Sequence, residues 1–410
     1  MKLLILSDLE STGGAAIACQ RLTQGLIGLG VDCVRAVGAM DGGAPTQEKF
    51  LLSPGRRLEG VTGLAHAFGL GRVEERLSNH GVRRQLRHAI AREKPDVIHL
   101  HNLHKAGWDT GLVEECAAHA PVVWTLHDLW STTGRCCYAY DCEKFVTGCD
   151  ASCPTPGEYP ALAPHRIAAA WAARKTVLET HPNIVAACPS CWIAGEARRG
   201  LWHKNRVEVI ANGLDLEAYK PADAASAQAA LGLDPRVPTV LLVADYLKER
   251  RKGGNLIDAV LAATQTRPLQ LLTLGHWPPE IHHEGIRHIH CGYIPSDLMK
   301  SVIYSAADVL LHMAPVDNLP NTVAESLACG TPVVACAVGG VPEMVKPGET
   351  GWLAGSFSAE SFAATLDQGL QALRNGAWPR PACRQFAEDH FDVRRQAKQY
   401  LELFESLLSA

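Results

Sequence analysis

Residues 317–338, DNLPNTVAESLACGTPVVACAV, contain the pattern that decides the fold of this chain. Pro320 stands where a helix begins, a position at which the missing proline N–H costs little, and Gly330 ends that helix. The apolar run that follows shows no alternation, which is typical of a strand buried on both faces of its sheet. A helix followed by such a strand predicts an α/β fold with a parallel sheet.

The same alternation of apolar runs and helical stretches extends through both halves of the chain. It predicts two Rossmann-like, doubly wound α/β domains, whose ligands bind beyond the carboxyl ends of the strands. The 410 residues are also more than one hydrophobic core usually serves. The strand-like runs are KLLILSD (2–8), PDVIHLHN (95–102), VVWTLHD (122–128) and NIVAACPS (183–190) in the first half, and TVLLVAD (239–245), LQLLTLG (269–275), DVLLHMA (308–314) and PVVACAV (332–338) in the second.

A turn-rich connection is expected to separate the two domains. The stretch VEVIANGLDLEAYKP, residues 207–221, interrupts the alternation. We therefore predict a first domain over residues 1–212, with a cysteine-rich insert at 134–154, and a second domain over 213–385. Residues 386–410 have the pattern of an amphipathic helix, which we expect to pack back on the first domain.

The composition is that of a globular protein without a global basic field. Hydrophobic residues make up 47% and charged residues 20%, and the formal net charge of −4 gives no support for nucleic acid binding. The cluster Arg83, Arg84 and Arg87 is interpreted as a solvated helix face, with a weak contact to a membrane surface as the alternative. The opening MKLLILSDLESTGG reaches acidic residues before a long apolar core, and no run reaches the roughly 18–20 apolar residues of a spanning helix. We expect a cytoplasmic protein, with peripheral contact at the inner membrane face as its alternative location.

Small and polar residues follow the strands of the first domain. Gly13 and Gly14 stand at the start of a helix, where backbone N–H groups can approach a phosphate or a sugar closely. A plain tight turn explains this pair equally well. His101 and His127 follow two successive strands, which favours contact with a polar substrate over two unrelated structural histidines.

In the second domain, Arg251 and Lys252 stand between a strand and a helix that we expect to begin at Gly253. Cations oppose the dipole of a helix N-terminus, and a bound anion such as a diphosphate would resolve that conflict. An exposed run of charges is the alternative interpretation.

The helix in residues 317–338 offers a second set of ligand contacts. The N–H groups of Asn321 and Thr322 at its start could hold a phosphate. Glu325 lies about one turn further on the inward face, where an ionised carboxylate needs a partner. Its two oxygens suit the vicinal diol of a ribose, and a salt bridge to an arginine is the alternative. A second glycine pair, Gly339 and Gly340, follows the next strand.

These residues resemble the retaining, nucleotide-sugar-dependent glycosyltransferases of family 4, whose GT-B fold has two Rossmann-like domains facing a cleft. The resemblance is strongest over DNLPNTVAESLACGTPVVACAVGGVPEMVKPGETGWL, residues 317–353, which is similar to the family's pair of acidic residues separated by seven positions. RRKGG, residues 250–254, resembles the phosphate-binding Lys–Gly segment, and residues 207–221 resemble the interdomain connection. The form DNLPN is similar to enzymes that build bacterial surface or exported polysaccharides.

The resemblance implies a role for each matching residue. Glu325 would bind the donor ribose, and Asp317 would contact the transferred sugar. Lys252, with Arg251, would neutralise the diphosphate, and His127 would approach the reacting sugar. The expected catalytic residues are thus Lys252, Asp317 and His127. The other expected donor-binding residues are Gly13, Gly14, Asn321, Thr322, Gly339 and Gly340.

The sequence departs from the family pattern at two positions. Asp317 is one methylene shorter than the usual glutamate, and Tyr246 stands where an arginine commonly precedes the lysine. In retaining members the leaving phosphate accepts the proton of the acceptor, so we assign no general base. We also expect no metal cofactor for catalysis.

The insert GRCCYAYDCEKFVTGCDASCP, residues 134–154, gathers five cysteines in one loop. A loop of this length without its own structure is uncommon, and a structural zinc site can organise such a segment. Disulfides are disfavoured in the cytosol, whereas free buried thiols are common and remain the other alternative. The predicted zinc ligands, which leave out Cys136 in favour of the more even spacing, are Cys137, Cys142, Cys149 and Cys153.

The sequence therefore predicts a retaining glycosyltransferase of the hexosyltransferase type. It would move a sugar from a nucleoside diphosphate sugar to a glycan or a lipid-linked acceptor in polysaccharide biosynthesis. Two alternatives stay open: a non-catalytic assembly protein that binds a nucleotide-sugar, and a nucleotide-sugar epimerase of the same fold.

Overall fold

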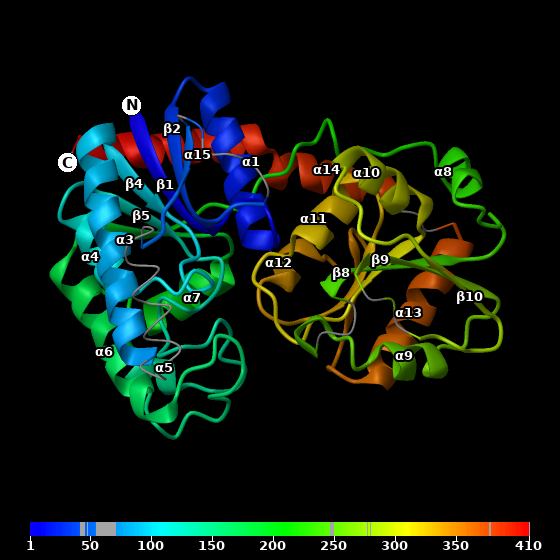
Figure 1. Ribbon diagram of the computed structural model, residues 1–410. Coiled ribbons are helices and arrows are strands. Elements are labelled where there is room, and N and C mark those ends of the chain that lie inside the picture. The colour runs from blue at the N-terminus through cyan, green and yellow to red at the C-terminus, as the bar shows by residue number, and fades with distance from the viewer. Residues whose placement is uncertain are drawn as a thin grey trace. The chain divides into compact units, whose positions relative to one another are not determined.

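The computed structural model describes residues 1–41, 46, 48–54, 71–246, 250–276, 278, 280–376 and 379–409. The chain forms two compact units, one made of Met1–Ile210 with Gln396–Ala410 and the other of Ala211–Arg395. Figure 1 shows that each unit is a sheet with helices on its faces. The predicted α/β fold class with two parallel sheets is confirmed.

The first unit contains a seven-stranded sheet in the order β3-β2-β1-β4-β5-β6-β7, with every pairing parallel. Because β1 lies between β2 and β4, connections leave it toward opposite edges, and ligands of α/β sheets bind at such switch points. The strands are β1 (Lys2–Leu9), β2 (Asp32–Ala39), β3 (Lys49–Leu51), β4 (Val97–Leu100), β5 (Val122–Thr125), β6 (Ile184–Cys188) and β7 (Val207–Val209).

Two hydrophobic cores cover the faces of this sheet. Along β1, Leu4 and Leu6 belong to one core, while Leu3 and Ile5 belong to the other. This division explains the absence of alternation in the sequence, because both faces of the strand are buried. The helices of the first unit are α1 (Gly14–Gly28), α3 (Gly71–Glu93), α4 (Thr110–Ala117), α5 (Lys144–Thr147), α6 (Pro164–Thr180), α7 (Cys191–Arg199) and α15 (Val393–Leu408).

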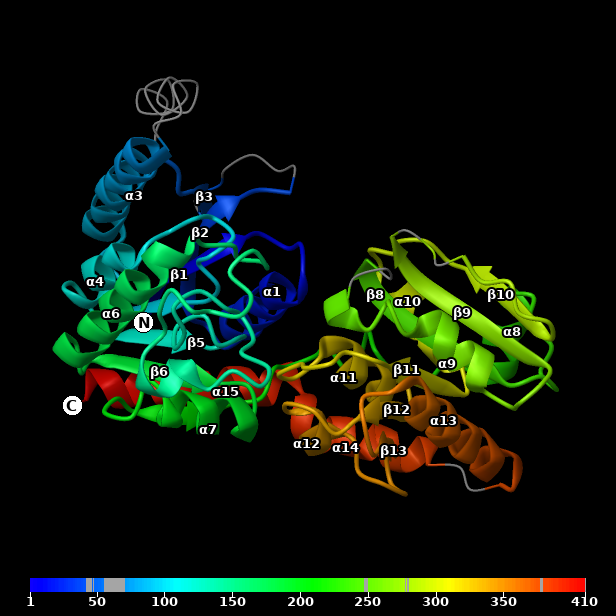
Figure 2. The same cartoon turned by 90° about the horizontal axis from the view of Figure 1, so that it is seen from below.

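The end of the chain is built from two helices, where the sequence predicted one. The first, α14 (Arg380–Phe391), belongs to the second unit, and the chain leaves helical geometry at Asp392 before α15 begins. Helix α15 packs its apolar face against the first sheet beside α1 (Figures 1 and 2). The Tyr400 hydroxyl lies 2.8 Å from Thr125 Oγ1 at the end of β5, which adds a buried polar contact to this packing.

The second unit repeats the design with a six-stranded parallel sheet in the order β10-β9-β8-β11-β12-β13. Its switch point lies between β8 and β11, so the segments that follow these two strands are the natural place for a ligand. The strands are β8 (Thr239–Tyr246), β9 (Leu269–His276), β10 (Ile286–His290), β11 (Val309–His312), β12 (Val333–Cys336) and β13 (Gly351–Ala354).

Helices cover both faces of the second sheet (Figure 2). Residues of α9 and α13 form one core with alternate strand residues, and residues of α10, α11 and α14 contribute to the other. None of the helices in the described residues combines the length and the apolar character that crossing a membrane requires. The elements not yet given are α8 (Ala224–Ala230), the 3-10 helix η1 (Arg250–Lys252), α9 (Ile257–Ala263), α10 (Asp297–Ala306), α11 (Asn321–Ala328), α12 (Val341–Met344) and α13 (Ala359–Arg374).

Candidate active site

Lys252 and Asp317 form an ion pair at the carboxyl end of the second sheet. Lys252 ends η1, after β8, and its Nζ lies 2.8 Å from Oδ2 of Asp317 in the loop after β11. Burial alone would raise the pKa of Asp317, but the Lys252 ammonium and neighbouring cations, among them Arg251, hold that pKa below its usual value. The structure thus places all three of these predicted residues within electrostatic reach of one another.

Two glycines near this ion pair each allow a close approach between backbone segments: Gly253 to Met313, and Gly339 to Asp317. Gly253 has φ +77°, and a Cβ there would lie 2.0 Å from the carbonyl oxygen of Met313. Gly339 has φ +56°, and its Cβ would lie 1.9 Å from the carbonyl oxygen of Asp317. The N–H of Gly340 donates to that same Asp317 oxygen at 3.0 Å. The second glycine pair therefore fixes the backbone that carries Asp317.

His312 is a third polar residue of this site, and the sequence analysis did not single it out. It ends β11, its Nε2 lies 3.9 Å from Asp317 Oδ2, and with Lys252 it lines a small pocket beside β8 and β11. Burial lowers the pKa of His312 to about 4, so the ring is neutral at pH 7. Its position at a strand end was a usable signal, since the same rule identified His101 and His127.

A tyrosine is one partner of Glu325. Glu325 is 5% exposed in α11, and the Tyr304 hydroxyl of α10 donates to its Oε2 at 2.9 Å. Burial, and then the Glu325 carboxylate, raise the pKa of Tyr304 well above its usual value. A carboxylate accepts about four hydrogen bonds, so this contact is compatible with a diol on the same group.

The first turn of α11 presents Asn321 and Thr322, as the sequence predicted for its start. Pro320 occupies the N-cap position, and its carbonyl accepts from the N–H groups of Val323 and Ala324. The backbone N–H groups of a first helical turn have no partner within the helix itself. The assignment of phosphate contacts to Asn321 and Thr322 stays a prediction.

In the first unit, Gly13 and Gly14 lie where β1 gives way to α1. Gly13 is the N-cap of α1 with φ +87°, and a Cβ on it would meet no heavy atom within 4 Å. The glycine is therefore required by its backbone conformation. Its role in lining a ligand site stays a prediction.

His127, which follows β5, is partly buried and belongs to a row of three histidines with the fully buried His101 and His99. Its Nε2 lies 2.8 Å from Nδ1 of His101, and the His101 ring lies 4.3 Å from that of His99 between centroids. Burial lowers the pKa of His127 to about 4 and that of His99 to about 3, and it also lowers the pKa of His101. His127 is therefore a neutral hydrogen-bonding group at pH 7.

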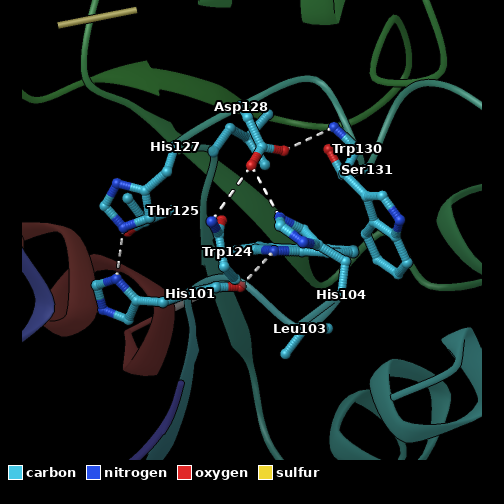
Figure 3. A pocket seen from close by; sticks show the side chains of 11 residues that line it. His101, Leu103, His104, Trp124, Thr125, His127, Asp128, Trp130 and Ser131 are labelled. Carbon is cyan, nitrogen blue, oxygen red and sulfur yellow. Dashed lines mark hydrogen bonds and ion pairs between the residues drawn. The ribbon is translucent and has the colours of Figure 1, made fainter. Parts of the chain in front are cut away.

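A pocket beside these histidines contains a second polar cluster (Figure 3). The Asp128 carboxylate lies 2.9 Å from His104 Nε2 and accepts from Asn102 Nδ2 at 3.2 Å and from the Trp130 N–H at 2.9 Å. Burial opposes both charges, yet the pairing raises the pKa of His104 and lowers that of Asp128. His104 was missed by the sequence analysis, although HLHNLH places it three residues after His101.

The four cysteines predicted to bind zinc do not form a group with their sulfur atoms all within 4.8 Å of one another, and zinc binding by them stays a prediction. Cys137 Sγ faces His104 Nε2 at 3.5 Å. Burial raises the pKa of Cys136, which the prediction left out, to about 11, and the thiols of Cys153, Cys149 and Cys142 add to that rise. Among the described residues, one group of three His, Cys, Asp or Glu side chains has its potential ligand atoms within 4.8 Å of one another. Its members are His104, Asp128 and Cys137. No disulfide links the cysteines of the insert.

The second unit thus combines cations, buried carboxylates and a helix start at its switch point. Such a set can bind a phosphorylated, hydroxyl-rich ligand, because ammonium and guanidinium groups bind phosphate and carboxylates accept from sugar hydroxyls. One of its members, Tyr304, comes from packing that the sequence pattern did not specify, whereas His312 stands at a strand end.

Comparison with known proteins agrees with this architecture. The sequence profile of Glycosyltransferase Family 4 matches residues 12–218, half of the chain, and that of Glycosyl transferases group 1 matches residues 237–372. The colanic acid biosynthesis glycosyl transferase WcaC of Escherichia coli (strain K12) is 29% identical over 254 residues, which are 59% of this chain and 60% of that protein. D-inositol 3-phosphate glycosyltransferase of Mycobacterium sp. (strain KMS) is 32% identical over 175 residues, 40% of either chain. The chain therefore spans at most 60% of the length of these two relatives.

Solved structures of glycosyltransferases have the same fold over the whole chain. Sucrose-phosphate synthase from Thermosynechococcus elongatus has a TM-score of 0.74 at 21% identity, with 100% of this chain and 99% of that chain covered. HepE from Anabaena, in complex with UDP and glucose, has a TM-score of 0.64 at 16% identity, with 99% and 100% covered. These similarities confirm the predicted GT-B fold. With that fold, and with half of its length matched by the family profile, the chain belongs to glycosyltransferase family 4.

Proposed function

We propose that this family member transfers a sugar from a nucleoside diphosphate sugar to a glycan or lipid-linked acceptor, with retention of anomeric configuration, in polysaccharide biosynthesis. The observation that carries the proposal is the pair of buried carboxylates at the switch point of the second sheet, with Lys252 held by the first of them. Similar proteins support it: WcaC bears the name of a colanic acid biosynthesis glycosyl transferase, and HepE was solved in complex with UDP and glucose.

Lys252 has the central role in the proposed mechanism. As the bond between the sugar and the diphosphate breaks, negative charge grows on the leaving group, and a preorganised cation stabilises that charge. The ammonium of Lys252 is paired with Asp317. A bound diphosphate would compete for this cation and leave the Asp317 carboxylate to accept hydrogen bonds from the sugar.

Glu325 is proposed to bind the ribose. Tyr304 holds the carboxylate through Oε2, which fixes its orientation before the ligand arrives. A fixed carboxylate loses less side-chain entropy when two vicinal hydroxyls donate to it. The acceptor is assigned to the first unit, where neutral His127 can donate or accept a hydrogen bond without carrying a charge.

Calorimetric titration with UDP-, GDP- and ADP-linked sugars tests the proposal. We expect one donor class to bind the wild type, and Glu325→Gln to weaken that binding while exposed Glu360→Gln in the same unit does not. Transfer to an acceptor then separates a glycosyltransferase from a nucleotide-sugar-binding assembly protein, which would bind the donor without turnover. Interconversion of the donor sugar without an acceptor would indicate an epimerase and contradict the proposal.

A further inference from the structure

Three separate segments of the first unit bring one nitrogen, one oxygen and one sulfur ligand together. His104 comes from the segment after β4, Asp128 from the segment after β5, and Cys137 from the cysteine-rich insert. The side chains of His104 and Asp128 are 8% and 9% exposed, and Cys137 is 9% exposed. The group lies beside the pocket of Figure 3, at the carboxyl ends of β4 and β5.

One distance within this group equals an edge of a tetrahedral coordination shell, and the other is a hydrogen bond that would lengthen by about 0.4 Å on metal binding. Bonds of about 2.0 Å to nitrogen or oxygen and about 2.3 Å to sulfur put a nitrogen and an oxygen ligand roughly 3.3 Å apart, and a nitrogen and a sulfur ligand roughly 3.5 Å apart. His104 Nε2 lies 2.9 Å from Asp128 Oδ2 and 3.5 Å from Cys137 Sγ. One ring nitrogen therefore faces a carboxylate and a thiol at once, and its single N–H proton can be shared well with only one of them.

The outer contacts of the group are those that metal ligands usually have. A ligating histidine commonly engages a partner through its second ring nitrogen, and ligating carboxylates are themselves hydrogen-bonded. Nδ1 of His104 lies 2.8 Å from the Tyr159 hydroxyl. The Asp128 carboxylate accepts from Asn102 Nδ2 and from the Trp130 N–H. These contacts orient His104 and Asp128 in the ligand-free protein.

We propose that His104, Asp128 and Cys137 bind one divalent cation of the zinc class. A thiolate and a carboxylate neutralise the two positive charges, which removes the cost of a net charge in a buried site, and the mixed nitrogen, oxygen and sulfur set suits zinc better than magnesium or calcium. Three protein ligands leave a fourth position for water or for a ligand in the pocket. Binding displaces the thiol proton and the proton shared by His104 and Asp128.

The cation would attach the cysteine-rich insert to the segments at the carboxyl ends of β4 and β5. Between Leu126 and Ala163 the structure contains one short helix, α5, and the rest of the segment is turns and loops. A bond from Cys137 to a cation that His104 and Asp128 also bind would hold the start of this segment in place. The proposal concerns this site alone and is independent of the donor site in the second unit.

Cobalt and zinc titrations of the chelator-treated full chain test this proposal. We expect one equivalent of Zn²⁺ to bind per chain by calorimetry, and Co²⁺ to give a sulfur-to-cobalt charge-transfer band in the near ultraviolet. Cys137→Ser removes the band, whereas Cys142→Ser and Cys153→Ser, in the same insert, keep it. Tyr159→Phe weakens binding by about 10–100-fold, the usual effect of losing an outer contact of a ligand.

Two outcomes would overturn the proposal. If the protein binds neither cation, then His104, Asp128 and Cys137 form a hydrogen-bonded cluster and not a metal site. A band that survives in Cys137→Ser and disappears in Cys142→Ser or Cys153→Ser assigns the metal to the other thiols of the insert. Far-ultraviolet circular dichroism checks that each variant is folded. If Cys137→Ser fails to fold, His104→Gln supplies the same test, since it keeps the thiol and is expected to lower Zn²⁺ affinity by more than about 100-fold.

Discussion

Nζ of Lys252 lies 2.8 Å from Oδ2 of Asp317, so the cation proposed to bind the donor diphosphate is held by a carboxylate of the same site. The Lys252 ammonium lowers the pKa of the Asp317 carboxyl although that group is buried. The pair also sets the position of the ammonium, because Asp317 is itself anchored by Gly340. The site is therefore organised before a ligand arrives.

Replacement of Lys252 by alanine is expected to lower turnover by about 10²–10³-fold, the usual effect of removing one group that stabilises charge in a transition state. Initial rates with saturating donor measure this effect. Lys220→Ala, at an exposed lysine of the same unit, is the matched control and should leave turnover unchanged. Equal rates for the two variants would remove Lys252 from the mechanism.

The Lys252–Asp317 pair should also show energetic coupling in the folded protein. A double-mutant cycle with Lys252→Met and Asp317→Asn is expected to give an interaction free energy of about 0.5–3 kcal/mol, since contacting residues are not additive. The value should lie in the lower part of this range because the Lys252 side chain is 27% exposed. Urea unfolding of the four proteins measures it, and additive effects would mean that the pair contributes nothing to stability.

Gly339→Ala is expected to damage the site more than an ordinary glycine substitution. The positive φ alone costs an alanine about 1–2 kcal/mol, and at Gly339 the new Cβ would also overlap the carbonyl oxygen of Asp317. Gly348 has φ +82° with no heavy atom within 4 Å of a Cβ, so Gly348→Ala carries only the conformational cost. Unfolding free energies and donor affinity should both fall further for Gly339→Ala, and equal losses would show that the close approach is unimportant.

Removal of the Tyr304 hydroxyl should destabilise the protein, because the buried Glu325 carboxylate loses a hydrogen-bond donor. Tyr304→Phe is expected to lower the free energy of unfolding by about 1–3 kcal/mol. Tyr293→Phe, at a tyrosine that is 52% exposed, serves as the control and should change it little. An unchanged free energy of unfolding in Tyr304→Phe would mean that other groups suffice to hold Glu325.

Mild acid is expected to destabilise the first unit through His99. Burial lowers its pKa to about 3 in the folded protein, against about 6.5 in the unfolded chain. Between these values the unfolded state binds the extra proton, so stability falls as the pH falls, by at most about 1.4 kcal/mol per pH unit for this residue. In urea unfolding, the free energy of unfolding of His99→Gln should fall less between pH 6.5 and pH 4.5 than that of the wild type. The exposed control His119→Gln should fall as much as the wild type.

The fold could be predicted because strands buried on both faces lose their alternation. Runs such as KLLILSD and PVVACAV form β1 and β12 for this reason. Because the strands are parallel, Lys252 after β8 and Asp317 after β11 both lie at the carboxyl end of the sheet. The break at Asp392 could not be seen, because the amphipathic pattern continues across it from α14 into α15.

The partners within the site were harder to predict than its position. Tyr304 reaches Glu325 because α10 packs beside α11, and no local pattern in the sequence specifies that contact. Cys137 and Cys136 are neighbours in the chain, yet Cys137 Sγ faces His104, whereas the pKa of Cys136 is raised by burial and by Cys153, Cys149 and Cys142. Even spacing in the sequence gave no guide to that division, because the direction of a side chain in an irregular loop depends on the tertiary contacts.

The proposed reaction transfers a sugar from a nucleoside diphosphate donor with retention of configuration. Once calorimetry has identified the donor, its reaction with a polysaccharide-type acceptor can be followed by NMR, with the anomeric configuration of the first product read from its proton couplings. We expect an acceptor-linked sugar with the same anomeric configuration as in the donor, formed by the wild type and by Lys220→Ala and greatly slowed in Lys252→Ala. A product of opposite configuration would contradict the retaining mechanism, and donor binding without any acceptor-linked product would contradict the transferase itself.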